Sequence, residues 1–323
     1  MTVTPTTPTA LQSEQVMFLL EARAASAVLA ASLELGVLDR LEQSPVDAAT
    51  LVRDCGIRAE TAPALLSALA SLGLIKPDHG GAFVGVAADL TWFVEFLRRW
   101  DSFADGLRNQ AEPRVGAPPG ADEAFCRTVG PLATLCSPAV TTATEQLIGA
   151  GRRVLDLGAG AVPWSLALAA ADPDVVVTAV DLPAVLPVTR ETVTAAGREA
   201  QFRFLEEDMF TVSPGDHAFD LVFLGHVCHL FDDSTNRSLM GRVARWLAPG
   251  GTVAIIDFLP NERRDGPRSV ALYAVELAQR APGGQLYPFS SYAGWLRERG
   301  FEKIERFELA DGVPVSLIRA RLG

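Results

Sequence analysis

The sequence predicts an α/β protein in which a doubly wound, mostly parallel sheet follows a mostly helical N-terminal domain. After Gly151, short apolar runs alternate with helical patterns, which is the order of a parallel sheet covered on both faces. Over the first hundred residues, apolar side chains recur at three- and four-residue spacing, which indicates helices. A chain of 323 residues has room for two domains, which we expect at 1–105 and 106–323.

The N-terminal domain has the outline of a winged helix. A long helix from Val16 to Leu41, interrupted at Gly36, precedes two shorter helices and a predicted hairpin over 76–86. A winged helix suggests DNA binding, but the segment Glu60–Leu74 carries no Lys or Arg, and the chain has a net charge of −11. We therefore expect no nucleic-acid partner. The apolar first helix is interpreted as a dimerisation surface, although it could simply cover its own domain.

We expect no targeting signal in this sequence. The first residues lack the basic and apolar regions of a signal peptide, and no uninterrupted apolar run reaches the roughly 18 residues of a membrane span. The cysteines Cys55, Cys126, Cys136 and Cys228 form no Cys-x-x-Cys pair, which fits a reducing compartment. We expect a cytoplasmic protein without a membrane partner. A Pro/Gly-rich loop is expected at about 112–123, close to the domain boundary.

The elements after Gly151 follow one another in a regular order. Strands are expected within 152–160, 175–183, 201–210, 217–231 and 252–260, with helices within 164–171, 184–197, 236–251 and 290–301. Two last apolar runs, 303–309 and 315–322, have no helix between them. They predict an antiparallel hairpin at the edge of the sheet.

A glycine-rich turn follows the first of these strands. Ligands of doubly wound sheets bind at the carboxyl ends of the strands, and the segment Asp156-Leu157-Gly158-Ala159-Gly160 stands at such an end. Its glycines allow a ligand to approach the backbone, and Asp156 could orient the turn or meet a cation. The next glycine of a dinucleotide fingerprint would fall at Pro163, which argues against NAD.

Acidic residues end the next two strands in the same register. Asp181 ends the second strand, where a carboxylate can accept hydrogen bonds from both hydroxyls of a ribose. Asp208 and Met209 end the third strand and offer an acid and a flat apolar contact for an adenine ring. Three such motifs in register predict a nucleoside-containing cofactor.

The runs VLDLGAG, AVDLP, EDMF, HVCHLFDD, LAPGG and IIDFLP together resemble the class I S-adenosylmethionine-dependent methyltransferases. More narrowly, the chain resembles, from about residue 14 to 323, the O-methyltransferase family with an N-terminal dimerisation winged helix, found in plant phenylpropanoid and bacterial polyketide pathways. The resemblance implies a Rossmann-like seven-stranded sheet, S-adenosyl-L-methionine as cofactor and an intertwined homodimer. It also implies a cofactor site in which Gly158 contacts the amino-acid portion, Asp181 and Leu182 the ribose, and Asp208 and Met209 the adenine, with Asp156, Gly160 and Gly225 beside them.

The loop after the fourth strand carries the predicted base. It reads from Gly225 to Asp233, and His229 matches the histidine of the family pattern His-Asp-Trp-Ser-Asp, with Phe231 at the tryptophan position. The resemblance implies that His229 is the general base, and an imidazole can take a phenol or enol proton near neutral pH. A structural or helix-capping histidine is the alternative.

The family supports its histidine with two acids. One follows the fifth strand, where this sequence has Asp257, shorter by one methylene than the family's residue. The other lies after a Gly-Gly pair, but the corresponding segment Gly283–Pro288 contains no carboxylate. We expect Asp257 to orient His229. The site would then depend more on proximity and orientation, or its acceptor would differ.

A metal site is a second interpretation of the same loop. His226 and His229, with Asp232 or Asp233, place two imidazoles and a carboxylate close together in sequence, as in α-keto-acid C-methyltransferases that use a metal. In an extended chain, however, residues three apart face opposite sides, so we do not expect a metal. A third alternative is a member that retains the cofactor without methylating, acting as an isomerase or a binding subunit.

The acceptor is expected to be a small secondary metabolite, methylated at a phenol, enol or carboxylate oxygen. The helix Val270–Arg280 should cover it, with Tyr273, Leu277 and Arg280 beside Phe231 of the loop. Arg280 leaves room for a carboxylate on the acceptor. The tryptophans Trp164, Trp246 and Trp295 are interpreted as core residues rather than ligand contacts.

Overall fold

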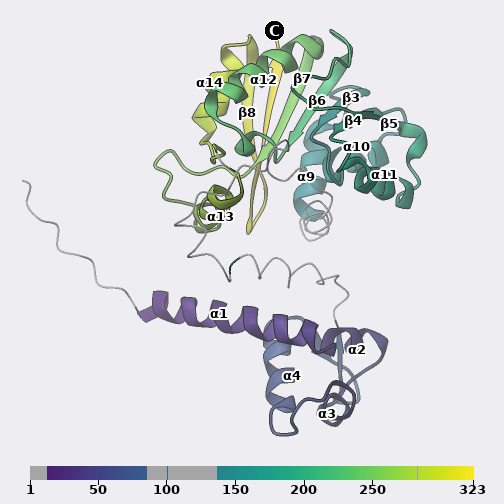
Figure 1. The fold of residues 1–323 in the computed structure, drawn as a ribbon, viewed down its shortest axis with the longest axis vertical. Coiled ribbons are helices and arrows are strands. Elements are labelled where there is room, and N and C mark those ends of the chain that lie inside the picture. Colours follow the sequence, from purple (N-terminus) through teal and green to yellow (C-terminus); the bar gives the residue numbers. More distant parts are fainter. Residues whose placement is uncertain (1–12, 86–99, 101–136, 282) are drawn as a thin grey trace, which may run out of the picture. The chain divides into compact units, whose positions relative to one another are not determined.

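The structure is a computed structural model that describes residues 13–85, 100, 137–281 and 283–323 (Figure 1). The chain divides into two compact units, Met1–Ser102 and Phe103–Gly323, and each is described by itself. The boundary expected near residue 105 and the loop expected over 112–123 lie outside the described residues. Both therefore stay predictions.

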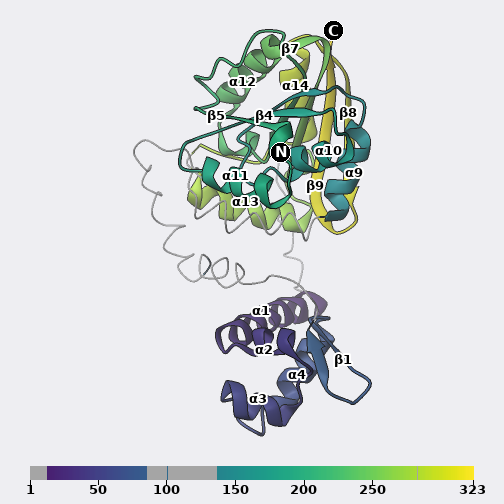
Figure 2. The same ribbon diagram turned by 90° about the vertical axis from the view of Figure 1, so that its right-hand side faces the viewer.

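The first unit contains the predicted helices and hairpin. Its elements are α1 (Ser13–Glu34), α2 (Val37–Gln43), α3 (Ala48–Cys55), α4 (Ala62–Ser71), β1 (Ile75–Pro77) and β2 (Phe83–Gly85). Gly36 separates α1 from α2 because its left-handed φ of 68° ends the helical path at little cost for glycine. The strands β1 and β2 pair antiparallel beside α4 (Figure 2). This unit has its own hydrophobic core, which includes Val37, Leu51 and Leu69.

Helix α1 exposes large apolar side chains. Met17, Leu19 and Leu20 are 51%, 60% and 60% exposed. Among the described residues, α1 is the one helix long and apolar enough to cross a membrane by length and composition. The core helix of a soluble protein or a signal sequence would pass the same test, so this finding is weak evidence for a membrane span. Such an exposed apolar face is typical of an interface with another protein.

The second unit contains a seven-stranded sheet with the predicted edge hairpin. Its strands are β3 (Arg153–Leu157), β4 (Val176–Asp181), β5 (Phe202–Glu206), β6 (Phe219–Gly225), β7 (Leu247–Asp257), β8 (Phe301–Ala310) and β9 (Val313–Leu322). Their order is β5-β4-β3-β6-β7-β9-β8, in which β3 to β7 pair parallel and β9 pairs antiparallel with β7 and β8. Residues 247–251, the end of the helix expected within 236–251, lie instead within β7, beside an irregularity in its pairing with β6.

Helices cover both faces of this sheet (Figure 1). Residues of α9 (Ser137–Leu147), α10 (Pro163–Ala171) and α11 (Leu186–Ala195) join one core cluster, and residues of α12 (Asp233–Trp246) and α14 (Phe289–Arg297) join the other. Along β7, Val253 and Ile255 belong to one cluster while Ala254 and Ile256 belong to the other, because successive strand side chains point to opposite faces. Trp164, Trp246 and Trp295 are buried, as predicted.

The parallel strands bring their carboxyl ends to one edge. The predicted motifs follow β3, β4, β5, β6 and β7, so this edge gathers residues that are far apart in sequence. The helix α13 (Arg268–Arg280), which carries the predicted acceptor contacts, follows β7 in the chain.

Candidate active site

The glycine turn after β3 is closely packed. Gly158 has a φ of 66°, and a Cβ placed on it would lie 2.7 Å from Val227 Cγ2 and 3.1 Å from Met209 Cε. A side chain at this position would therefore both strain the backbone and collide with its neighbours. The contact also places the turn after β3 against Met209, which follows β5, as the cofactor motifs require.

Asp181 ties the end of β4 to the glycine turn. Its Oδ2 accepts a hydrogen bond of 2.8 Å from the Gly160 amide, and its Oδ1 accepts one of 2.8 Å from the Leu182 amide. Burial raises the pKa of Asp181, and the two amide hydrogen bonds act in the opposite direction. The carboxylate thus shapes the turn that it faces.

Asp156 lies beneath the same turn and is 5% exposed. Its Oδ2 accepts a short hydrogen bond from the hydroxyl of Ser165, on α10. Burial raises the pKa of Asp156 to about 7, against the effect of that hydrogen bond. The Asp156 carboxylate thus joins β3 to α10 through Ser165.

The remaining predicted cofactor residues lie at the same edge of the sheet. Asp208 follows β5 and its Oδ1 accepts a hydrogen bond of 2.8 Å from the Phe210 amide. Gly225 ends β6, and a Cβ on it would lie 2.9 Å from the ring of Trp164. Asp208, Met209, Leu182 and Gly225 are half-buried, so each keeps some surface for a ligand.

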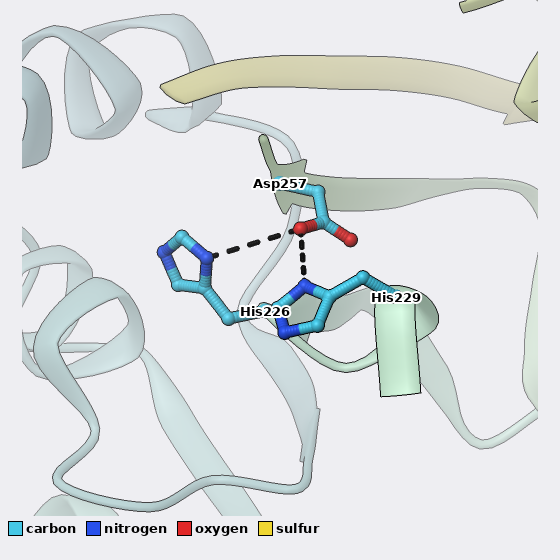
Figure 3. A group of neighbouring side chains, drawn as sticks. All are labelled: His226, His229 and Asp257. Carbon is cyan, nitrogen blue, oxygen red and sulfur yellow. Dashed lines mark hydrogen bonds and ion pairs between the residues drawn. The ribbon is translucent and has the colours of Figure 1, made fainter. Parts of the chain in front are cut away.

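His229 and Asp257 form a buried hydrogen-bonded pair (Figure 3). The Nδ1 of His229 lies 2.6 Å from Oδ1 of Asp257, and the two side chains are 2% and 0% exposed. His229 lies in a 3₁₀ turn, Cys228–Leu230, that follows β6, and Asp257 ends the neighbouring β7. The two side chains predicted to work together are therefore joined by the pairing of adjacent strands.

Two further donors and a second imidazole lie around the Asp257 carboxylate. Besides the His229 bond, its Oδ1 accepts a bond of 2.9 Å from the Phe258 amide, and its Oδ2 accepts one of 2.8 Å from the hydroxyl of Tyr292. Burial alone would raise the pKa of Asp257, but His229 and the nearby His226 hold that pKa below its ordinary value. Asp257 is therefore ionised and accepts the Nδ1 proton of His229.

Tyr292 was not anticipated from the sequence. It lies on α14, is fully buried, and its pKa is raised well above the ordinary value by burial beside Asp257. Its hydroxyl donates to Oδ2 of Asp257, the carboxylate that bonds His229. No local sequence pattern marks Tyr292 as a site residue. The one signal in the sequence is that tyrosine is rare, with three in the chain.

The expectation that His226 and His229 would face opposite sides is wrong. The chain leaves β6 through the left-handed His226, whose φ is 58°, and enters a 3₁₀ turn, where residues three apart lie on one side. As a result, Nδ1 of His226 lies 4.0 Å from the same Asp257 oxygen that His229 contacts (Figure 3). The two rings are 6.2 Å apart.

Asp233 is not part of this group, so the metal alternative with Asp233 as third ligand is wrong. Its Oδ1 accepts a hydrogen bond of 2.8 Å from Trp295 Nε1, and its Oδ2 accepts one of 2.6 Å from Arg237. Asp232 caps α12 through the Thr235 amide. Within the described part of the chain, the one possible metal group joins His226 and His229 with Asp257.

The structure places the predicted acceptor residues in different surroundings. Tyr273 on α13 contacts His229, since its hydroxyl lies 3.1 Å from Nε2 of that residue. Leu277 has no exposed surface, because it packs in a cluster behind Phe258 and Tyr273, so its expected direct contact with the acceptor is wrong. Phe231 is half-buried and packs edge-on against Phe210 at 4.9 Å. The side chain of Arg280 lies outside the described residues and stays a prediction.

The Gly-Gly loop runs beside the base, as the family pattern implies. A Cβ on Gly284 would lie 2.7 Å from the carbonyl oxygen of His229. The next residue, Gln285, bonds Arg264 and the hydroxyl of Tyr287, which in turn donates to the carbonyl of Phe231. The Gly-Gly loop thus supports the backbone of the loop Gly225–Asp233 at Phe231. It brings no carboxylate to the His229 imidazole.

Comparisons with known proteins agree with this geometry. The family model of the O-methyltransferase domain matches residues 116–302, and that of the O-methyltransferase dimerisation domain matches residues 17–88. The chain belongs to the O-methyltransferase family. It is an S-adenosylmethionine-dependent methyltransferase with a dimerisation domain.

Named relatives and solved structures cover nearly the whole chain. The 3-hydroxy-5-methyl-1-naphthoate 3-O-methyltransferase of Streptomyces sahachiroi is 25% identical over 87% of each chain. The mitomycin biosynthesis 6-O-methyltransferase of Streptomyces lavendulae is 26% identical over 90% of this chain and 89% of its own. The structure of human N-acetylserotonin methyltransferase in complex with S-adenosylmethionine is similar at a TM-score of 0.74 and 24% identity, covering 98% of this chain and all of that one.

Proposed function

We propose that this methyltransferase acts on a phenol, enol or carboxylate oxygen of a small secondary metabolite, with His229 as general base. The observation that carries the proposal is the buried bond of 2.6 Å between His229 Nδ1 and Asp257 Oδ1. In the neutral imidazole this bond fixes the proton on Nδ1, so that Nε2 is the nitrogen that can take the acceptor's proton. The names of the hydroxynaphthoate and mitomycin relatives support this class of acceptor.

The residues at the strand ends fit S-adenosylmethionine. When bound, S-adenosylmethionine supplies a sulfonium methyl group, whose carbon–sulfur bond breaks as the new carbon–oxygen bond forms and whose electron pair stays on sulfur. The Gly158 turn leaves no room for a side chain, and Asp181 keeps acceptor capacity for ribose hydroxyls beyond its two amide bonds. We assign Gly158, Gly160 and Gly225 to close approach of the backbone, Asp181 and Leu182 to the ribose, Asp208 and Met209 to the adenine, and Asp156 to the turn itself.

Asp257 and Tyr292 position the base. As Nε2 accepts a proton the imidazole becomes positive, and the ionised Asp257 at 2.6 Å stabilises that charge. The Tyr292 hydroxyl at 2.8 Å holds the other carboxylate oxygen and so fixes the orientation of the pair. Phe231, Tyr273 and Arg280 remain our candidates for acceptor contacts.

A metal-assisted C-methylation is not favoured, since the hydroxynaphthoate and mitomycin relatives are named O-methyltransferases. We therefore expect full activity after exhaustive chelation. Loss of activity that one divalent metal restores would support the metal group instead. The non-methylating alternative is likewise not favoured, since the named relatives are methyltransferases.

The exposed apolar face of α1 supports a homodimer formed through the N-terminal domain. Met17, Leu19 and Leu20 lie on this helix, inside the segment that matches the dimerisation domain. We further propose that the protein works in the cytoplasm without a nucleic-acid or membrane partner, which the net charge of −11 supports.

Methyl transfer from labelled S-adenosylmethionine to 3-hydroxy-1-naphthoate tests the proposal. We expect the label on the hydroxyl oxygen, a product heavier by one CH₂ unit, and a rate that falls about 10²–10⁴-fold in His229→Gln, as for loss of a general base. Calorimetry with S-adenosylhomocysteine confirms that the variant still binds cofactor. An undiminished rate in the variant would remove His229 as the base, and an isomer of unchanged mass would indicate the non-methylating alternative.

A further inference from the structure

The base of the resting protein already has a hydrogen-bond partner. In neutral His229 the proton is on Nδ1, because the ionised Asp257 at 2.6 Å only accepts. Nε2 then carries the ring's one available lone pair, and the hydroxyl of Tyr273 at 3.1 Å donates to it. The place where an acceptor hydroxyl must bind for deprotonation is therefore taken by a tyrosine hydroxyl.

The two bonds of the imidazole differ in length. At 2.6 Å the Asp257 bond is a short, charge-assisted one, whereas 3.1 Å is long for a hydroxyl donor. A ligand that competes for the imidazole will therefore replace Tyr273 rather than Asp257. Tyr273 is also half-buried, while Asp257 is fully buried, so a displaced Tyr273 hydroxyl can reach solvent.

The ring of Tyr273 is held independently of its hydroxyl. It packs against Phe258 with the ring centres 4.4 Å apart, and it meets the His229 ring edge-on at 5.5 Å. Phe258 directly follows Asp257, so the Tyr273 ring lies beside the segment that carries the Asp257 carboxylate. Substitution by phenylalanine would remove the bond to Nε2 and leave this packing in place.

We infer that Tyr273 is a positioning residue whose hydroxyl caps Nε2 of His229 in the resting protein and is displaced by the acceptor hydroxyl. This inference rests on the proposed function of His229. Every acceptor that binds at Nε2 breaks the same Tyr273 bond, so the cap lowers the apparent affinity for all such acceptors by one factor. The bound acceptor gives its proton to Nε2, and its oxygen then takes the methyl group.

Two measurements on the wild type and Tyr273→Phe test this inference. In the resting protein the ¹⁵N resonance of His229 Nε2 should move downfield in the variant, toward that of a nitrogen without a hydrogen bond. In turnover with S-adenosylmethionine, kcat/KM for 3-hydroxy-1-naphthoate should rise about 2- to 10-fold in the variant, the worth of one neutral hydrogen bond. Ser290→Ala is the control, because its hydroxyl bonds the exposed Glu262 and not the base.

Each outcome decides between the inference and its failure. An unchanged Nε2 resonance would show that Tyr273 does not cap the base. An unchanged kcat/KM, or the same change in Ser290→Ala, would show that the acceptor does not have to displace Tyr273. Failure of the proposed function looks different, since His229→Gln would then keep its rate whatever the nitrogen resonance shows.

Discussion

Replacing Asp181 by alanine should weaken cofactor binding strongly. The carboxylate has about four acceptor positions, and the amides of Gly160 and Leu182 use one on each oxygen at 2.8 Å. One position on each oxygen is left, which matches the two hydroxyls of a ribose. Asp181→Ala removes both ribose contacts and also leaves the Gly160 amide without its carboxylate acceptor.

The magnitude follows from those two contacts. A hydrogen bond to a charged group contributes about 1.5–3 kcal/mol, so two contribute about 3–6 kcal/mol. At about 1.4 kcal/mol per tenfold change, Asp181→Ala should bind S-adenosylhomocysteine about 10²–10⁴-fold more weakly. Asp181→Asn keeps one carbonyl oxygen and should fall between the wild type and the alanine variant.

Isothermal titration calorimetry with S-adenosylhomocysteine measures the effect, and circular dichroism checks that each variant is folded. Asp174→Ala is the matched control, since Asp174 is an exposed acid just before β4 whose partner is Arg152. It removes the same charge at the opposite end of the strand and should leave the affinity unchanged. An Asp181→Ala protein that binds within threefold of the wild type would refute the ribose assignment.

Three other predictions follow from the buried groups of the site. Asp257→Asn should slow methyl transfer about 10²–10⁴-fold in single-turnover assays, because an amide can donate to Nδ1 of His229 and move the ring proton to Nε2; a rate within twofold would contradict this. Gly158→Ala should lose about 1–3 kcal/mol in urea unfolding beyond the loss in Gly197→Ala, since both have positive φ but only Gly158 lacks space. Because the folded pKa of Asp156 is about 7 and its ordinary value 3.8, the native state keeps a proton that the unfolded state releases, and stability falls as pH rises between these values. Asp156→Asn should therefore flatten the loss of unfolding free energy between about pH 4 and about pH 7, and an equal loss would refute the assignment.

The sheet was predictable from the alternation of strands and helices, and parallel strands bring their carboxyl ends to one edge, so residues that end neighbouring strands meet there. The pairing of His229 with Asp257 was predicted from the resemblance to the family, and the structure joins the two side chains at this edge. His226 was misplaced because the prediction assumed an extended chain, and one left-handed residue before a 3₁₀ turn reversed its direction. Asp233 was misplaced because its partners, Arg237 and Trp295, lie on α12 and on the more distant α14.

The tyrosines explain how the site works without the family's second acid. All three of the chain lie between Tyr273 and Tyr292, and each donates to a different atom of the catalytic loop or its support. A second carboxylate beside fully buried Asp257 would repel it and favour its protonated form. A tyrosine hydroxyl on Oδ2 instead stabilises the single negative charge and adds none. When His229 takes the acceptor's proton, the pair becomes neutral overall, so the buried site gains an ion pair without an unpaired charge.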